Sequence, residues 1–115
     1  MAKTRWHIVK DGQGGITLSR QLPARFDFAV AATVPACHPV RLAHQVRQDM
    51  WRALQGLRGF LPVVEIVKDG NQMYIRAGGA VQGSLPLAYV QGLVSQILHD
   101  PKRRARWIMH AGRAK

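Results

Sequence analysis

Hydrophobic and polar positions alternate in three short segments of the first third of the chain. Residues 5–9 and 16–19 lie on either side of a Gly-rich stretch, which is typical of two strands joined in a hairpin. From Phe26 to Val34 every second residue is hydrophobic, and this spacing predicts a third strand with one buried face. The prolines that follow are expected to end this strand, because proline lacks the N–H that a sheet requires.

The pentapeptide IVKDG occurs twice, at residues 8–12 and again at residues 66–70. Each copy ends a run of β-branched residues with Asp-Gly, a pair that tolerates the backbone angles of a chain reversal. Alternation over residues 72–77 follows the second copy and predicts a second hairpin, with a short extra strand at residues 77–83 as an option. Because the two regions differ outside the pentapeptide, we interpret the repeat as one local turn made twice, not as a duplicated unit.

Three helices are predicted where the hydrophobic spacing lengthens. From Val40 to Leu57 an apolar sector of about 3.6-residue period contains Leu42, Ala43, Val46, Met50, Ala53, Leu54 and Leu57. Ser84 is expected to cap a second helix that continues to His99. Asp100-Pro101 supplies the cap and first residue of a terminal helix, which runs from Lys102 to about Ala111.

The order β-β-β-α-β-β-α-α places the chain in the α+β class. Strands joined by short hairpins pair antiparallel, so we expect an antiparallel sheet of five or six strands, built from two hairpins plus an additional strand. One long amphipathic helix and two C-terminal helices are expected to pack on this sheet. With 115 residues, the chain fits a single compact domain over residues 1–115.

The net charge indicates more about the partner of this protein than any motif does. The chain has 17 Lys and Arg residues against six Asp and Glu residues, which gives a formal net charge of +11 at pH 7. Such an excess favours a polyanion or an acidic protein surface as partner, and nucleic acid is the foremost example. High-GC coding also enriches arginine, so composition alone leaves open whether the charge is functional.

The remaining composition indicates a cytoplasmic protein with no membrane segment. The single cysteine, Cys37, has no partner for an internal disulfide. The first twelve residues lack the apolar core of a secretion signal. The longest apolar run, residues 28–34, is far shorter than the ~20 residues that cross a bilayer.

The polar side of the long helix is the first candidate nucleic-acid-binding surface. A helical projection separates its members from the apolar sector; they are Arg41, His44, Arg47, Trp51, Arg52 and Arg58. Guanidinium groups bind phosphate in a bidentate manner, and an indole can stack on a base. The alternative is that Trp51 is covered by the N-terminal hairpin or by another subunit, and that the arginines are only a solvated face.

The C-terminal helix is the second candidate nucleic-acid-binding surface. Its basic side contains Lys102, Arg103, Arg106 and His110, whereas Ala105, Ile108 and Met109 are expected to form the docking side. Cations in a first helical turn are unfavourable because the helix dipole is positive there, which suggests an external phosphate or an acidic groove. Trp107 lies between the two sides, either as a core anchor or as a stacking group, and a plain solvated tail is the remaining alternative.

No catalytic residue, metal site or cofactor is predicted. Asp11 and Asp69 are assigned to turns and Asp100 to a cap, and the other acids show no pairing that suggests acid–base chemistry. Cys37 with the adjacent His38 does not complete a zinc site, so we interpret Cys37 as a buried residue of a proline-bounded loop.

These patterns favour a small, basic, non-enzymatic nucleic-acid-binding protein that contacts the phosphate backbone with weak sequence selectivity. RNA and DNA are equally compatible with the charge. The alternative is a protein-interaction module, an accessory or regulatory subunit that binds an acidic partner protein, with homodimer formation through the sheet or the long helix as an option.

Overall fold

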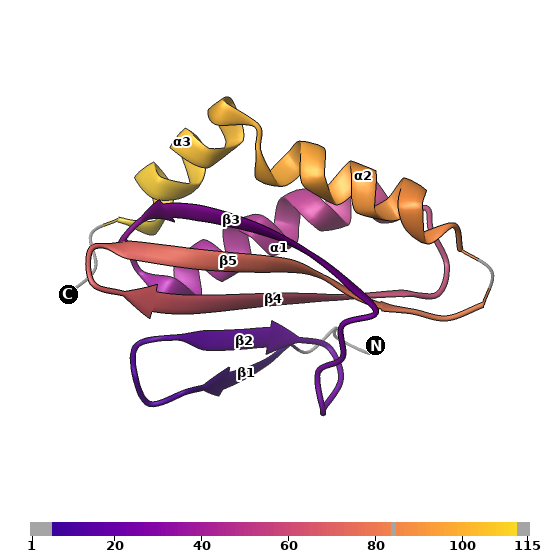
Figure 1. Ribbon diagram of the computed structural model, residues 1–115, viewed down its shortest axis with the longest axis horizontal. Helices are drawn as coiled ribbons and strands as arrows, with labels where there is room; N and C mark the ends of the chain where they lie inside the picture. The colour runs from indigo at the N-terminus through magenta and orange to yellow at the C-terminus, as the bar shows by residue number, and fades with distance from the viewer. Residues whose placement is uncertain (1–5, 84, 113–115) are drawn as a thin grey trace, which may run out of the picture.

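The structure is a computed structural model that describes residues 6–83 and 85–112. It contains a five-stranded antiparallel sheet and three helices in the predicted order, which confirms the α+β class (Figure 1). The elements are β1 (His7–Lys10), β2 (Ile16–Ser19), β3 (Phe28–Pro35), α1 (Pro39–Leu54), β4 (Phe60–Asp69), β5 (Gln72–Val81), α2 (Leu87–Leu98) and α3 (Pro101–Ala111). The expected start of the first strand at Arg5 and the expected cap Ser84 lie outside the described residues.

The strand order across the sheet is β1-β2-β4-β5-β3. Both predicted hairpins form, β1 with β2 and β4 with β5, and they join through the pairing of β2 with β4. The third strand crosses to the far edge, where Val34 pairs with Met73 and Phe28 with Gly79. Residues 77–81 continue β5, so the optional sixth strand is not a separate element.

The two IVKDG copies make different turns, so the prediction of one turn made twice was wrong. After β1 the reversal spans residues 11–15, and the Asp11 side chain accepts hydrogen bonds from the backbone N–H groups of Gln13 and Gly15. After β4 only residues 70 and 71 separate the paired residues Asp69 and Gln72. Asp-Gly permits a reversal in both places, but the residues that follow it decide the length of the loop.

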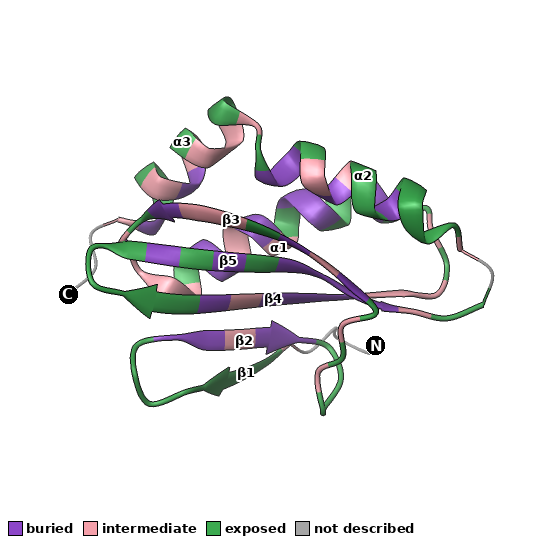
Figure 2. Cartoon of the chain, viewed as in Figure 1, coloured by how far each residue is buried: buried purple, intermediate pink, exposed green. Residues whose placement is uncertain are grey.

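All three helices cover one face of the sheet, and the strands pass in front of α1 in Figure 1. One hydrophobic core lies between the layers, as the purple segments in Figure 2 show. Its fully buried members include Leu18, Val64 and Ile75 from the sheet, and Leu42, Val46, Met50, Val94 and Trp107 from the helices. The opposite face of the sheet has no helix on it among the described residues.

The apolar sector of α1 is largely as predicted, with Ala53 as an exposed exception. The predicted docking side of α3 was wrong, because Ala105 and Met109 are exposed while Trp107 and Ala111 are buried. Trp107 offers more apolar area than an alanine or methionine, and it also brings a polar N–H that finds a partner inside. These two properties set the rotation of α3 about its axis.

Side chains cap the N-termini of two helices. Asp100 caps α3 as predicted, since its carboxylate accepts a hydrogen bond from the Lys102 backbone N–H at 3.0 Å. The His38 imidazole plays the same role for α1 toward the Arg41 backbone N–H. Within the described ranges no helix combines the length and the apolar character that crossing a bilayer requires.

Candidate nucleic-acid interface

Trp51 lies on the solvent side of α1 and is the most prominent feature of the predicted surface. Half of it, 50%, is exposed to solvent. Arg41 and Arg52 are also exposed, whereas His44 and Arg47 are half-buried. Trp51 and Arg47 are one helical turn apart, so both lie on the same side of α1. The structure thus keeps the indole and its neighbouring guanidinium groups on one helix face.

Trp6, just before β1, joins this face through cation–π contacts that the sequence did not reveal. The Arg47 guanidinium carbon lies 4.9 Å from the centre of the Trp6 ring, and that of Arg20 lies 6.0 Å from it. Contacts of this kind hold a guanidinium in place without neutralising it. Two positive charges therefore stay close together beside α1, oriented by a ring from the N-terminal segment.

A small hollow connects Trp51 with Arg20. It has a volume of about 110 Å³, and its walls include Arg20, Trp51, Gln55, Leu57, Phe60 and Pro62. Aromatic and aliphatic walls with a guanidinium and an amide at the edge suit a flat heterocycle that carries a negative charge nearby. Neither Arg20 nor Trp6 had been predicted, because only the tertiary fold brings β2 and residue 6 next to α1.

His44 is held neutral in this environment. Burial, followed by the positive charge of Arg47, lowers the pKa of His44 below its usual value of 6.5. The Arg47 Nε donates a hydrogen bond to His44 Nδ1 at 3.2 Å, which requires the unprotonated imidazole nitrogen. Burial also lowers the pKa of Arg47, but a guanidinium remains charged at neutral pH.

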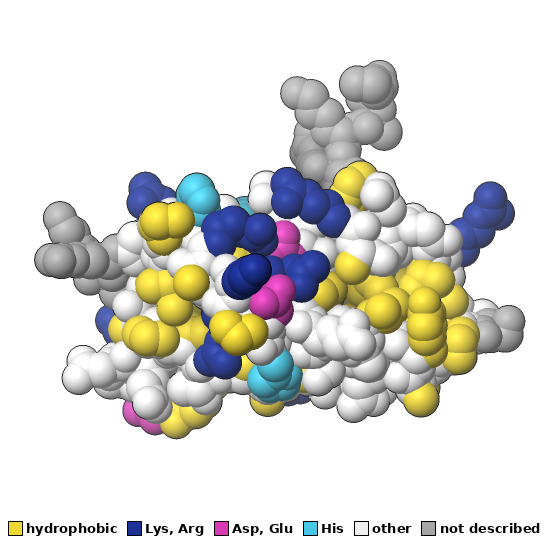
Figure 3. Space-filling model, turned by 90° about the horizontal axis from the view of Figure 1, so that it is seen from above, with side chains coloured by type: hydrophobic (Ala, Val, Ile, Leu, Met, Phe, Trp, Pro, Cys, Tyr) yellow, Lys and Arg dark blue, Asp and Glu magenta, His cyan; other side chains and the backbone are white. Residues whose placement is uncertain are grey.

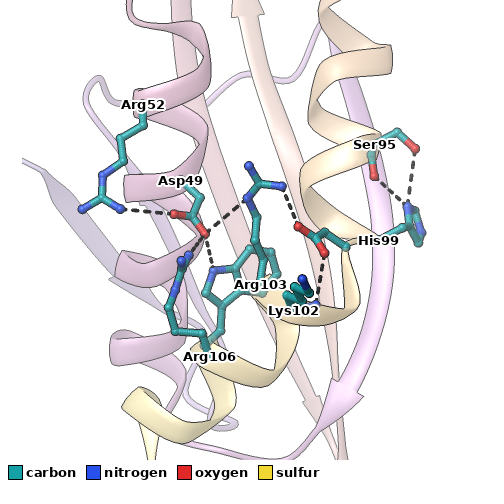
Figure 4. A network of polar contacts seen from close by, with 9 residues as sticks. Asp49, Arg52, Ser95, His99, Lys102, Arg103 and Arg106 are labelled. Atoms are coloured by element: carbon teal, nitrogen blue, oxygen red, sulfur yellow. Dashed lines mark hydrogen bonds and ion pairs between the residues drawn. The ribbon is translucent and has the colours of Figure 1, made fainter.

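Asp49 organises the other border of α1, where α3 packs against it (Figure 4). Its side chain is only 6% exposed and accepts a hydrogen bond of 2.7 Å from the Trp107 indole N–H. Arg106 donates to the same carboxylate, and guanidinium nitrogens of Arg52 and Arg103 lie 3.7 and 3.9 Å from it. This Asp49 cluster, comprising Asp49, Arg52, Arg103, Arg106 and Trp107, ties α3 to α1.

The Asp49 cluster changes the interpretation of the C-terminal helix. Trp107 is fully buried, so of the two roles predicted for it the structure supports that of a core anchor and not that of a stacking group. Arg103 pairs with Asp100 at 2.7 Å as well as approaching Asp49, which explains a cation in the first turn without an external anion. Arg104, not singled out from the sequence, donates to the Thr33 carbonyl and holds α3 against β3.

The other predicted residues do not converge on Trp51. Arg58 lies beyond the end of α1, beside Gln82 and Gly83. Lys102 and His110 are exposed on α3. On the face seen in Figure 3, Lys and Arg side chains gather around carboxylates near the middle, and hydrophobic side chains lie on both sides of this group. The positive charge on this face is therefore clustered and not evenly spread.

Eight described cations have no described carboxylate within ion-pair distance: Lys10, Arg20, Arg41, Arg47, Arg58, Lys68, Lys102 and Arg104. Arg20, Arg41 and Arg47 of this set belong to α1 or its immediate neighbours. Arg41, however, lies beside Gly112 at the end of α3, so the unpaired positive charge is divided between the Trp51 side of α1 and α3.

Carboxylate side chains and the thiol of Cys37 have structural roles in the described part of the chain. Asp27, for example, accepts a hydrogen bond from the Val81 backbone N–H at 2.7 Å, and this bond is the main cause of its lowered pKa. Cys37 is fully buried, and burial raises the pKa of its thiol. No group of three or more His, Cys, Asp or Glu side chains suited to a metal ion occurs among the described residues.

Comparison with known proteins adds no family to these observations. The chain matches no protein-family model, no curated protein and no solved structure. The function must therefore be argued from the geometry and charge of the surface itself.

Proposed function

We propose that the protein binds single-stranded nucleic acid through the Trp51 surface, which we define as Trp51, Arg20, Arg47 and Arg52. The observation that carries the proposal is the half-exposed Trp51 indole, which shares a hollow with Arg20 on the basic side of α1. Large aromatic side chains usually find intramolecular cover, so an exposed indole among guanidinium groups favours a stacking ligand with a charged backbone.

In this proposal the arginines contact phosphates and Trp51 stacks on a base. Arg20 and Arg47 are oriented in advance by the Trp6 ring, which reduces the entropy lost on binding. Arg52 approaches Asp49 only at 3.7 Å, so it can turn toward a phosphate. Every base has a stacking face and phosphates carry no sequence information, so selectivity among sequences is expected to be weak.

A binding role without catalysis is part of the proposal. The burial of Cys37 and the hydrogen bonds that Asp27 and Asp49 accept support it, because these groups already have partners or cover within the protein. A cytoplasmic location is also proposed, supported by the single reduced cysteine.

Fluorescence anisotropy with a labelled single-stranded oligonucleotide tests the proposal. We expect Trp51→Ala to weaken binding by about fivefold to a hundredfold, since stacking on one base contributes about 1–3 kcal/mol. Trp51→Phe should retain part of the affinity because it keeps a ring. Tyr89→Ala is the control, because Tyr89 is an exposed aromatic on α2, away from the Trp51 surface. Equal affinities for all four proteins would refute the proposal.

A further inference from the structure

A second, larger hollow lies next to the hollow that Trp51 lines. Its volume is about 320 Å³, against about 110 Å³ for the hollow between Trp51 and Arg20, which we call the Trp51 hollow. Arg20 and Pro62 line both hollows, so the two are neighbours with Arg20 on their common border. We call the larger one the loop hollow, because residues 19–25, at the start of the connection from β2 to β3, form one of its walls.

The loop hollow forms because β4 extends beyond the end of β2. The last paired residues of these two strands are Ser19 and Val63, whereas β4 already begins at Phe60. Ser19 is buried, and its hydroxyl donates to the Gln21 carbonyl at 2.8 Å, which fixes the first turn of the loop. The loop leaves this end of β2 and returns to β3 at the same end of the sheet (Figure 1). The space between the loop and the start of β4 is the loop hollow.

The walls of the loop hollow combine apolar side chains of the sheet with polar side chains of exposed residues. Leu61, Val63 and Ala80 come from β4 and β5 and are buried or half-buried. Gln21 and Gln82 are exposed, and their amides offer both donors and acceptors. A volume of about 320 Å³ is within the range of roughly 300–1,000 Å³ that is typical of small-molecule sites. The loop hollow therefore has the size and the chemistry to take a heterocycle.

Arg20 and Arg25 border the loop hollow and differ in their partners. Arg20 is exposed and has no described carboxylate within ion-pair distance. Arg25 pairs with Asp27 at 3.1 Å, and the Val81 backbone N–H in turn fixes the Asp27 carboxylate at 2.7 Å. A guanidinium has several N–H donors, so Arg25 is held in place and still has donors for a phosphate. The free positive charge at the loop hollow comes from Arg20.

We propose that the loop hollow binds the nucleotide next to the one that stacks on Trp51, so that neighbouring nucleotides of one strand occupy the two hollows. This inference rests on the proposed nucleic-acid binding and extends it to a second site. Arg20 contacts the phosphate that joins the two nucleotides, because it lies on the common border. Arg25 contacts the phosphate beyond, and the apolar wall covers the second base. The smallest ligand that fills both hollows is a dinucleotide.

Competition of unlabelled thymidine monophosphate and thymidylate dinucleotide against a labelled single-stranded oligonucleotide, followed by fluorescence anisotropy, tests this inference. We expect the dinucleotide to compete at least about tenfold more strongly, because the joined second nucleotide adds its own contacts. Leu22→Asp places a carboxylate in the wall of the loop hollow and should remove most of this preference, since it repels the phosphates. The matched control is Leu87→Asp on α2, since Leu22 is 55% exposed and Leu87 is 43% exposed.

Arg25→Gln repeats the test with a smaller change at the same hollow. We expect it to weaken oligonucleotide binding about fivefold, because an exposed ionic contact contributes only modestly. Lys68→Gln, near the far end of β4, is the charge-matched control and should bind as the wild type does. Circular dichroism verifies that all variants are folded.

Two results would overturn the loop hollow alone. One is equal competition by the monophosphate and the dinucleotide. The other is unchanged oligonucleotide affinity in both Leu22→Asp and Arg25→Gln; if Trp51→Ala still binds more weakly, the proposed function stands. Equal weakening by Leu22→Asp and Leu87→Asp also contradicts the inference. Absence of oligonucleotide binding by the wild type at low salt would instead refute the proposed function, and the loop hollow with it.

Discussion

Asp49 shows how one residue can determine the role of several others. A single carboxylate of α1 accepts the Trp107 indole N–H and lies next to three guanidinium groups. Buried carboxylates require such partners, because desolvation of an unpaired charge is costly. The cluster consequently removes Arg103 and Arg106 from the set of free cations and leaves Arg52 at its exposed edge.

Substitutions at Asp49 separate its charge from its hydrogen bond. Asp49→Asn keeps an acceptor for Trp107 and loses the ion pairs, for which we expect a loss of about 1–2 kcal/mol in the free energy of unfolding. Asp49→Ala also leaves the buried indole N–H without a partner, and we expect it to lower the free energy of unfolding by about 3 kcal/mol. Urea denaturation measures the free energy of unfolding of both variants. As a control, Glu65→Gln breaks a more exposed pair and should cost less than about 1 kcal/mol. A smaller effect in Asp49→Ala than in Glu65→Gln would show that the cluster is not structural.

His44 gives the protein a pH dependence of defined sign. The pKa of His44 in the folded state is below 6.5, the usual value that applies in the unfolded chain. At pH values between the folded-state pKa and 6.5, the unfolded chain therefore binds more protons than the folded chain. Stability should therefore fall as pH decreases from 6.5 toward the folded-state pKa, and level off below it. Unfolding free energies measured at several pH values should lose this part of the slope in His44→Gln. In His7→Gln, on the exposed edge strand β1, the slope should remain. An unchanged slope in His44→Gln would argue against a neutral His44.

At the scale of elements, the buried side of α1 was predicted well and that of α3 was not, although the cap and the end of α3 were predicted correctly. The apolar sector of α1 repeats over four turns, so the period alone defines its buried side. In α3 a single large side chain outweighs the smaller residues Ala105 and Met109, and its N–H needs an acceptor on another helix. The partner of that N–H lies 58 residues away in the chain, and no local pattern indicates the contact.

The absence of a side chain at Gly79 allows β4 to lie close to β5 at this position. The φ angle of Gly79 is +148°, and a Cβ atom there would lie 2.0 Å from the Leu61 carbonyl oxygen. We expect Gly79→Ala to destabilise the protein by more than about 2 kcal/mol, measured by thermal or urea unfolding. Gly92→Ala is the matched control, because open space surrounds Gly92 in α2 and alanine favours a helix by about 1 kcal/mol. Similar stabilities for the two variants would contradict the close approach of β4 to Gly79.

At the scale of the whole molecule, the order of elements followed from the sequence but the order of strands did not. Nothing local indicates that β3 crosses to the far edge beside β5, because that position depends on packing under α2. The same is true of the candidate site. Trp51 and Arg47 were identified from the helical projection, whereas Trp6 and Arg20 reach α1 only through the fold of the N-terminal hairpin.

The molecule as a whole then has two contrasting surfaces. The Trp51 surface is basic and carries an exposed indole, whereas the helix-free face of the sheet presents exposed Val67 and Tyr74 beside the Glu65–Arg76 ion pair. Because α1 covers the other face of the sheet, nucleic-acid binding at the Trp51 surface would leave this helix-free face exposed to solvent.

The dependence of oligonucleotide affinity on salt tests directly whether the Trp51 surface binds nucleic acid. Plots of log Kd against log salt should be steep for the wild type, and Arg20→Gln and Arg47→Gln should each reduce the slope by about one. Lys68→Gln, near the turn after β4, is the charge-matched control and should keep the wild-type slope. Absence of binding at low salt, or one common slope for all four proteins, would contradict nucleic-acid binding by the Trp51 surface.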